Sequence, residues 1–348
     1  MLSSRAAIAA IVVLIGCGSK DGAKPSGTGS ATGSAKGSAV VATGSGSATG
    51  SGTGSGSAVS DAERLAKALT ETQADAAKET ARWTPDIEKA AIAVRDQPVT
   101  DTKTMLGKIL ASPHREPGNR DRDAARHPIE TLTFFGVTPT SKVIELGAGG
   151  GWYTELLAPL LADHGAYTVV GPDSTAPAGK MSTVSGKGLD LFLAKSPGLF
   201  GKVKRVGLVS ADTLVLGPPN SADIVVALRE MHNWQRRGDL AKYLAAIHAV
   251  LKPGGTFGLV AHRAKPGTKG EDTADTGYLD QQWVIDHVTA AGFKLAAKSE
   301  INANPKDTKD YTDGVWTLPP NYRLGDKDKA KYTAIGESDR MTLKFTKI

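Results

Sequence analysis

A short apolar segment followed by alternate glycines constrains the fold of this chain more than any other feature. Residues 142–146 have the pattern of a buried strand, and Gly147, Gly149 and Gly151 follow at alternate positions. From Trp152 onward, leucines recur at helical spacing. Glycines suit a backbone that turns with positive φ or lies against a ligand, and the next helix offers free N–H groups. The segment therefore predicts a strand, a ligand-binding turn and a helix.

The position of the acid distinguishes this turn from other glycine-rich turns. Glu145 precedes the glycines, whereas the dinucleotide fingerprint begins with glycine and has its acid about 20 residues later. A P-loop ends in Gly-Lys-Ser/Thr, but Trp152 and Tyr153 follow the last glycine here. An acid at this place suits an ammonium group better than a pyrophosphate. The segment resembles the first motif of class I S-adenosylmethionine-dependent methyltransferases; the alternative is a tight turn in another α/β domain.

The resemblance implies roles for residues in and after this motif. Glu145 and the glycine loop, made of Gly147, Gly149 and Gly151, would bind the methionine end of the cofactor S-adenosylmethionine. Residues 166–170 predict a second strand, after which these enzymes usually carry an acid that holds the ribose. Gly171 stands at the expected position and Asp173 follows two residues later. Asp173 is therefore the ribose candidate, on condition that the loop has shifted.

Two further strands carry candidates at their carboxyl ends. Residues 206–209 predict a third strand, and by resemblance Asp212 would meet the adenine amino group; the alternative is a strand-end turn. Residues 222–228 predict a fourth strand, directly before Arg-Glu-Met-His-Asn-Trp. Open α/β sheets place their chemistry at this edge. His232 is a candidate general base and Asn233 a candidate to orient the acceptor, with Trp234 excluding water. A structural histidine is the alternative.

A second motif supports the same fold. Leu-Lys-Pro-Gly-Gly at 251–255 ends a predicted helix over 239–251, and it resembles the turn before the fifth strand of class I methyltransferases. Strands are predicted at 256–261, 293–301 and 339–346, with a helix at 278–291. The resemblance covers residues 116–348 and implies an α/β, Rossmann-like, seven-stranded, mostly parallel sheet with helices on both faces and an antiparallel last strand.

Several segments around this frame have less specific patterns. Residues 174–204 look irregular, and 303–335 form a polar insertion suited to a rim over the site. His262, at the end of the fifth strand, is a weaker site candidate. The charged stretch before the fold contains Arg122, Asp123 and Arg126, which are candidates to touch a carboxylate or substrate. The alternative there is a solvated helix start with local ion pairs.

The N-terminal part has the organisation of a bacterial lipoprotein. Residues 1–17 combine a basic start, an apolar run of signal-peptide length and small residues before Cys17, and they resemble a lipobox. The resemblance implies cleavage before Cys17 and lipid on that residue; a plain signal sequence is the alternative. Residues 18–60 are a Gly/Ser/Ala/Thr-rich, disordered tether. Residues 61–115 predict helices, beginning with a capping box at Ser60.

Composition excludes two classes of partner. The net charge is +6, but lysines and aspartates alternate at 306–310 and 326–329, so no basic stripe for nucleic acid forms. The chain has one cysteine and seven scattered histidines, and no spacing of the kind that binds a metal. We therefore expect no metal and no nucleic-acid partner.

Together these patterns predict a methyltransferase that acts on a small-molecule acceptor, lipid-anchored in the cell envelope with its folded domain outside the cytoplasm. Because S-adenosylmethionine is made in the cytoplasm, export conflicts with this activity. The alternative is a lipoprotein that keeps the fold for binding another ligand or a protein partner without turnover. A third possibility is that the lipobox is incidental and the protein stays inside the cell.

Overall fold

The computed structural model describes residues 60–176 and 180–348. The predicted signal segment with Cys17, and the predicted tether apart from Ser60, lie outside these residues. Among the helices in the described ranges, none is long and apolar enough to cross a membrane.

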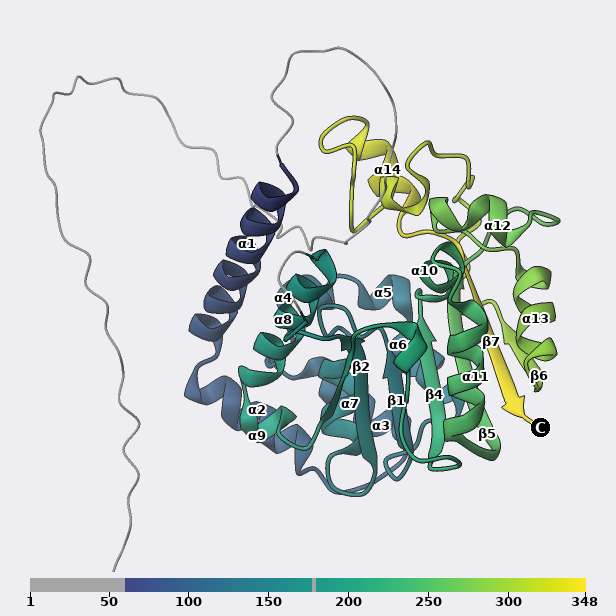
Figure 1. Cartoon of the computed structure of the whole chain (residues 1–348). Coiled ribbons are helices and arrows are strands. Elements are labelled where there is room, and N and C mark those ends of the chain that lie inside the picture. Colours follow the sequence, from purple (N-terminus) through teal and green to yellow (C-terminus); the bar gives the residue numbers. More distant parts are fainter. Residues whose placement is uncertain (1–59, 177–179) are drawn as a thin grey trace, which may run out of the picture. The chain divides into compact units, whose positions relative to one another are not determined.

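A single sheet organises the described part of the chain (Figure 1). Its strands lie in the order β3-β2-β1-β4-β5-β7-β6. All neighbouring pairs are parallel except those made by β7, which is antiparallel to β5 and to β6. This confirms the predicted seven-stranded, mostly parallel α/β sheet. The strands are β1 (Lys142–Leu146), β2 (Ala166–Pro172), β3 (Lys204–Leu208), β4 (Ala222–Leu228), β5 (Leu251–His262), β6 (Phe293–Ser299) and β7 (Arg340–Lys347).

The strand order reverses direction beside β1, which fixes where a ligand can bind. β1 pairs in parallel with β2 on one side and with β4 on the other. The chain moves outward from β1 through β2 to β3, and then returns to place β4 against β1. In open parallel sheets, ligands bind at the carboxyl ends of strands at such a reversal. Gly147 after β1, Asp173 after β2 and Arg229 after β4 share this edge.

Helices cover both faces of the sheet, as predicted, because each face buries its own apolar cluster. One cluster takes side chains from α10, α11 and α13, and the other from α2, α3, α6, α7, α8 and α9. The helices are α1 (Asp61–Arg82), α2 (Pro85–Arg95), α3 (Thr102–Ala111), α4 (Pro117–Arg120), α5 (Asp123–Arg126), α6 (Pro128–Phe135), α7 (Thr154–Leu161), α8 (Met181–Ala194), α9 (Pro197–Phe200), α10 (Met231–Arg236), α11 (Leu240–Val250), α12 (Gly270–Thr273), α13 (Gln281–Ala290) and α14 (Lys329–Ile335).

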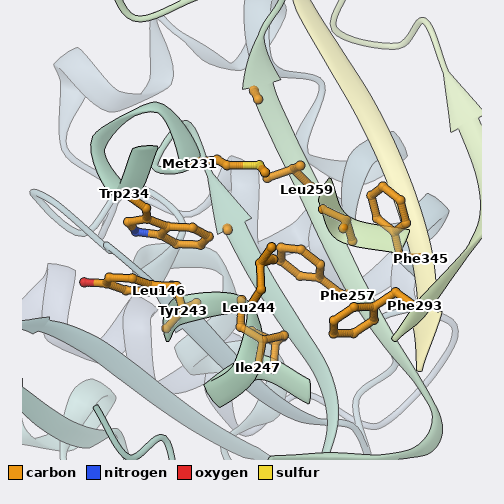
Figure 2. Packing of buried hydrophobic residues seen from close by; sticks show 14 of the residues in the cluster. Leu146, Met231, Trp234, Tyr243, Leu244, Ile247, Phe257, Leu259, Phe293 and Phe345 are labelled. Atoms are coloured by element: carbon orange, nitrogen blue, oxygen red, sulfur yellow. The ribbon is translucent and has the colours of Figure 1, made fainter. Parts of the chain in front are cut away.

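Trp234 belongs to the first of these clusters. Its indole is buried and stacks on the Tyr243 ring of α11, with centroids 4.4 Å apart and planes 7° apart (Figure 2). Met231, on the same short helix, also faces this core. The expectation that Trp234 walls off the site was therefore wrong. Its large apolar surface is worth most when it is fully buried, and the helix turns His232 to a different environment.

The N-terminal helices are part of the folded unit. Ser60 and Glu63 form the predicted capping box of α1, and α1 packs along α8. Thr84 caps α2 as predicted. Met105, Leu106 and Ile109 of α3 are buried in the second cluster together with leucines of α7. Helices α2 and α3 therefore share a hydrophobic core with the sheet, whereas α1 is held through α8.

Two local expectations needed correction. The segment 174–204, expected to be irregular, contains α8 and α9, because Leu189, Phe192 and Leu199 supply an apolar face that packs on the sheet. The motif at 251–255 belongs to β5 and is not a separate turn. Leu251 pairs with Ala222 and Thr256 with Ile224, so residues 252–255 bulge out of the ladder.

Candidate functional site

The glycine loop between β1 and α7 is built for close approach of a ligand. Gly147, Gly149 and Gly151 have φ angles of 72°, 56° and 84°, which disfavour other residues. The Gly147 N–H donates to the Val170 carbonyl at 2.9 Å and so extends the sheet. In the part of the chain that the structure describes, no acceptor pairs with the N–H groups of Gly149 and Gly150. A Cβ at Gly150 would meet open space, and one at Gly149 would come no closer than 4.0 Å to the Gly147 carbonyl oxygen, so these amides can face a ligand.

Side chains cover the two ends of this loop. A Cβ at Gly147 would lie 2.3 Å from Cγ of Glu230, and a Cβ at Gly151 would lie 2.5 Å from the Phe192 ring. Glu230 directly precedes α10, and Phe192 belongs to α8. The loop is therefore open only at Gly149 and Gly150, and Glu230 rests against the backbone at Gly147.

Glu145, the predicted acid of the loop, is buried at the end of β1. Its Oε2 accepts a hydrogen bond from the Tyr167 hydroxyl, which also pairs with Thr154 at 3.1 Å. Burial raises the pKa of Glu145 to about 7, against the lowering effect of the Tyr167 hydrogen bond. The carboxyl group is thus about half protonated near neutral pH, and a nearby cation would favour its ionised form.

Glu230 is a second carboxyl group at the loop, one that sequence reasoning missed. Burial raises its pKa to about 7, and Nδ2 of Asn233 donates to its Oε2 at 3.3 Å. Arg236 in turn donates to Oδ1 of Asn233 at 3.1 Å. Asn233, predicted to orient an acceptor, therefore holds Glu230 in place. The signal was present in the sequence, since Glu230 follows the apolar strand β4 by two residues.

Asp173 lies where a ribose-binding acid is expected. β2 runs two residues further than predicted, to Pro172, so Asp173 follows the strand directly. Its Oδ1 accepts hydrogen bonds of 2.7 Å from both the N–H and the hydroxyl of Thr175, which lower the pKa of Asp173. The carboxylate is therefore ionised and fixed in a turn at the correct edge of the sheet. Its role in binding a ribose stays a prediction.

Asp212 is placed less favourably. Its side chain is 74% exposed and forms an ion pair of 2.7 Å with Lys242 of α11. It lies in the 3-10 turn after β3 (Ala211–Thr213). Among the described residues its contact is thus with α11 rather than with the glycine loop. The structure leaves its predicted adenine contact untested.

His232, the predicted general base, is 4% exposed on α10. Its ring lies between His262 and Trp316, at centroid distances of 5.6 Å and 5.9 Å. Burial, with help from Arg236 and Arg229, lowers the pKa of His232 to about 3. A base with so low a pKa accepts protons poorly at neutral pH. Its Nδ1 has no partner among the described residues, so the ring is better suited to hydrogen bonding than to proton transfer.

The insertion at 303–335 reaches the site through Trp316, which packs on His232 as a rim residue would. His262, the weaker candidate, is bonded through Nδ1 to the Ser338 hydroxyl. Burial also lowers the pKa of His262 well below its usual value. Both histidines are therefore neutral at physiological pH.

A cluster of arginines lies beside these histidines, in which Arg126 and Arg340 are buried and Arg229 is half-buried. Arg126 and Arg340 both bind the carboxylate of Glu337, with N–O distances of 3.2 Å and 2.8 Å. Arg229, whose charge helps to lower the pKa of Arg126, is the third member. Arg126 also lies over the Trp152 ring, 4.9 Å from its centroid. We call Arg126, Arg229, Arg340 and Glu337 the arginine cluster.

The sequence identified only part of this cluster. Of the charged stretch before the fold, Arg126 joins it, whereas Asp123 pairs with Arg115 instead. Glu337 and Arg340 come from the segment that leads into β7, more than 200 residues away. Their signal was two charges directly before an alternating apolar strand, which sequence reasoning interpreted only as a strand start.

Comparison with known proteins supports the assignment of the fold. Residues 144–259, a third of the chain, match the family model described as a methyltransferase domain. No curated protein matches the chain.

Three similar solved structures have low identities and TM-scores. A SAM-dependent methyltransferase from Aquifex aeolicus is 15% identical over 70% of this chain and 98% of that chain, with a TM-score of 0.43. The glycopeptide N-methyltransferase MtfA in complex with S-adenosylhomocysteine is 16% identical over 65% of this chain and 90% of that chain, with a TM-score of 0.41. The [4+2]-cyclase SpnF is 15% identical over 64% of this chain and 81% of that chain, with a TM-score of 0.44. The family match and the strand order together give this domain a methyltransferase-type α/β fold.

Proposed function

We propose that the protein is an S-adenosylmethionine-dependent methyltransferase that acts on a small-molecule acceptor. One observation carries the proposal: the loop after β1 leaves Gly149 and Gly150 open directly beside two carboxyl groups, the buried Glu145 and the half-buried Glu230. This loop lies where the strand order reverses, the usual ligand position in such sheets.

The residues present fit this cofactor. Glu145 and Glu230 would ionise to bind its ammonium group, since a cation stabilises a carboxylate that burial keeps neutral. The free N–H groups of Gly149 and Gly150 would face its methionine end. Asp173 would hold the ribose hydroxyls, and Asp212 would reach the adenine only after leaving Lys242. When bound, the cofactor supplies a methyl group on a sulfonium for in-line attack by an acceptor nitrogen, oxygen or sulfur.

Positioning contributes most of the catalysis that we propose, because the sulfonium is already reactive. Asn233 and the neutral His232 would orient the acceptor through hydrogen bonds. The pKa of His232, about 3, makes it unsuited to remove a proton. The acceptor nucleophile would therefore enter in its neutral or deprotonated form.

Calorimetric titration of S-adenosylmethionine and S-adenosylhomocysteine into the full chain tests the proposal. We expect binding that is lost in Gly149→Val, because the side chain would fill the open face of the loop. Gly325→Val is the matched control, since Gly325 has a similar φ of 63° and open space around it. A well-folded protein that binds neither compound would refute the proposal.

The alternative is a binding protein that keeps the fold without turnover. The observation that favours it is that one end of the glycine loop is covered, because Glu230 already lies against Gly147. Binding of S-adenosylhomocysteine without any methyl transfer to candidate acceptors would favour this alternative. Fold alone does not decide between them.

We further propose that lipid on Cys17 anchors the protein in the cell envelope, with the folded domain outside the cytoplasm. The sequence pattern of residues 1–17 supports this proposal. Labelling of cells with palmitate should mark the wild type and not Cys17→Ser. A Cys17→Ser protein that still fractionates with membranes would contradict the lipid anchor.

A further inference from the structure

The arginine cluster has more positive than negative charge. Arg126, Arg229 and Arg340 contribute three cations, and Glu337 is the carboxylate that binds Arg126 and Arg340. Arg229 makes no ion pair with it, but its charge acts on Glu337 and also on Glu145 and Glu230 of the proposed cofactor site. Arg126 and Arg340 are only 2% and 3% exposed. Proximity of the other cations and burial lower the pKa of Arg126 to about 10 and also lower those of Arg229 and Arg340. Buried charges of one sign are costly unless an opposite charge compensates them.

The unused hydrogen-bond donors of the cluster point to the same need. Nη1 of Arg126 and Nε of Arg340 are buried without a partner in the described part of the chain. The Arg229 guanidinium makes no hydrogen bond to a described residue, although its backbone N–H donates to the Val260 carbonyl at 2.7 Å. Buried polar groups in native proteins are almost always paired. Guanidinium donors match the geometry of carboxylate and phosphate oxygens.

Backbone strain at Arg229 supports a role in binding. Its φ of 67° places it in the left-handed region, which costs a non-glycine residue energy and is commonest at functional sites. Arg229 follows β4 directly and precedes Glu230, which lies against the glycine loop. The cluster is therefore adjacent to the proposed cofactor site.

The cofactor is a poor source of the missing anion. S-adenosylmethionine carries an ammonium, a sulfonium and one carboxylate, so it brings a net positive charge. The cluster also draws on the start of β7 and on α5, whereas Asp173, the ribose candidate, follows β2 on the other side of β1. The surplus charge thus lies on the side of the sheet away from the predicted ribose site.

We infer that the methyl acceptor is an anionic small molecule whose carboxylate or phosphate group binds Arg126, Arg229 and Arg340. Calling the bound anion a methyl acceptor rests on the proposed function. The existence of an anion site does not. The three guanidinium groups hold the oxyanion, and the rest of the acceptor would extend toward His232 and Asn233 of α10, which follows Arg229 in the chain.

The test titrates inorganic phosphate into the full chain by calorimetry. We expect wild-type binding that is at least tenfold weaker in Arg229→Gln. Because Arg229 makes no side-chain hydrogen bond, this variant should unfold at the same or a higher temperature than the wild type. Arg237→Gln is the matched control, with the same charge change at an exposed position eight residues on. Arg126→Lys, which keeps the charge but loses the fork, should also bind phosphate more weakly.

Repeating the titration with saturating S-adenosylhomocysteine separates the two possible sources of the anion. Phosphate binding that persists supports an acceptor site. Competition between the two ligands would assign the cluster to the carboxylate of the cofactor and overturn the inference. Equal phosphate binding by wild type and Arg229→Gln, or none by either, would also overturn it. If phosphate binds but S-adenosylhomocysteine does not, the proposed function fails. The anion site then stands, but it can no longer be assigned to a methyl acceptor.

Discussion

Two largely buried ionic clusters each place a guanidinium over the Trp152 ring, and they are built differently. Arg115 lies 5.3 Å and Arg126 4.9 Å from its ring centroid. In the cluster of Arg115, Lys195 contacts Glu79, Glu116 and Glu155 at 3.0, 3.2 and 3.7 Å. We call this group, with Arg82 and Asp123, the acid-rich cluster. By contrast, the arginine cluster has three cations around one carboxylate.

Hydrogen bonding also differs between the clusters. In the acid-rich cluster, Glu155 accepts from the Glu116 N–H at 3.0 Å, from Asn119 at 3.1 Å and from Arg115 at 3.3 Å. Among the described residues, the unpaired buried atoms of the acid-rich cluster are a donor and an acceptor, Nη2 of Arg115 and Oδ1 of Asp123. The two in the arginine cluster are both donors, Nη1 of Arg126 and Nε of Arg340. A cluster whose charges nearly balance has the character of a structural element, whereas one with surplus cations and unpaired donors has that of an anion-binding site.

The largest effect that we expect is loss of stability when the acid-rich cluster is broken. Lys195→Met keeps the length of the side chain but leaves three carboxyl groups without their shared cation. Removing one partner of a buried ion pair typically costs about 3–5 kcal/mol, and Lys195 is almost fully buried. Urea unfolding measures the change. Lys202→Met, at a lysine whose side chain is 65% exposed, is the control and should lose much less. Equal losses would show that the cluster is not structural.

An added anion should stabilise a damaged arginine cluster, whereas we expect no such rescue of the acid-rich cluster. Glu337→Gln removes its carboxylate and should destabilise the protein strongly, because three cations then face one another. Burial opposes this carboxylate but the arginines lower the pKa of Glu337 to about 2. Inorganic phosphate should raise the melting temperature of Glu337→Gln more than that of the wild type. In Lys195→Met, phosphate should give no extra stabilisation beyond the wild-type shift, and an equal rescue there would remove the distinction between the clusters.

The pH dependence of cofactor binding compares Glu145 of the proposed cofactor site with Glu155 of the acid-rich cluster. Burial raises the pKa of both Glu145 and Glu155 to about 7. Their contribution to stability is therefore present below the unfolded pKa near 4.5 and is lost as the pH rises through 7. Binding of an ammonium group has the opposite sign, since it needs the ionised form. A group with a pKa of 7 is about a tenth ionised at pH 6 and nine tenths ionised at pH 8.

We therefore expect S-adenosylmethionine to bind about tenfold more tightly at pH 8 than at pH 6 for each carboxyl group involved. Calorimetry in buffers of different ionisation enthalpy would detect the protons released. Glu145→Gln should remove one tenfold step from this dependence and leave that of Glu230. Glu155→Gln should leave the profile unchanged, because Glu155 belongs to the acid-rich cluster. A flat profile in the wild type would contradict the proposed role of Glu145.

The smallest effect is expected for Asp212→Asn. Exposed ion pairs such as that with Lys242 contribute little, and the carboxylate faces α11. We expect less than a twofold change in S-adenosylmethionine affinity by calorimetry. A loss of tenfold or more would instead support the adenine contact that the sequence suggested.

The sheet could be predicted from sequence because its signals are local. β1 and β4 have the predicted bounds, since each is a short apolar run between turns. The extra residues of β2, Gly171 and Pro172, were missed because neither favours a strand. α8 was missed because Gly186 and Gly188 lie in its interior. The packing of α8 on the sheet outweighs that weak propensity.

The candidate site was less predictable, because its residues meet across long distances in the sequence. Glu145 was identifiable from its place before the glycines. Arg229 and Glu337 are more than 100 residues apart, and an excess of charge in one buried place is visible only after folding. The pKa of His232 depends likewise on burial by neighbours such as Trp316. The residue type alone suggested that His232 is a general base, but its buried environment lowers its pKa too far for that role.

The contact between Glu230 and Gly147 has a consequence for the time course of binding. A cofactor cannot approach that glycine until the glutamate side chain turns away, so association requires a conformational step before or after the encounter. Stopped-flow traces should then show an observed rate that levels off as the concentration of S-adenosylmethionine increases. Shortening the side chain in Glu230→Ala should restore a linear rise. The variant would then bind without the delay but would lack one of the two carboxyl groups proposed to bind the ammonium.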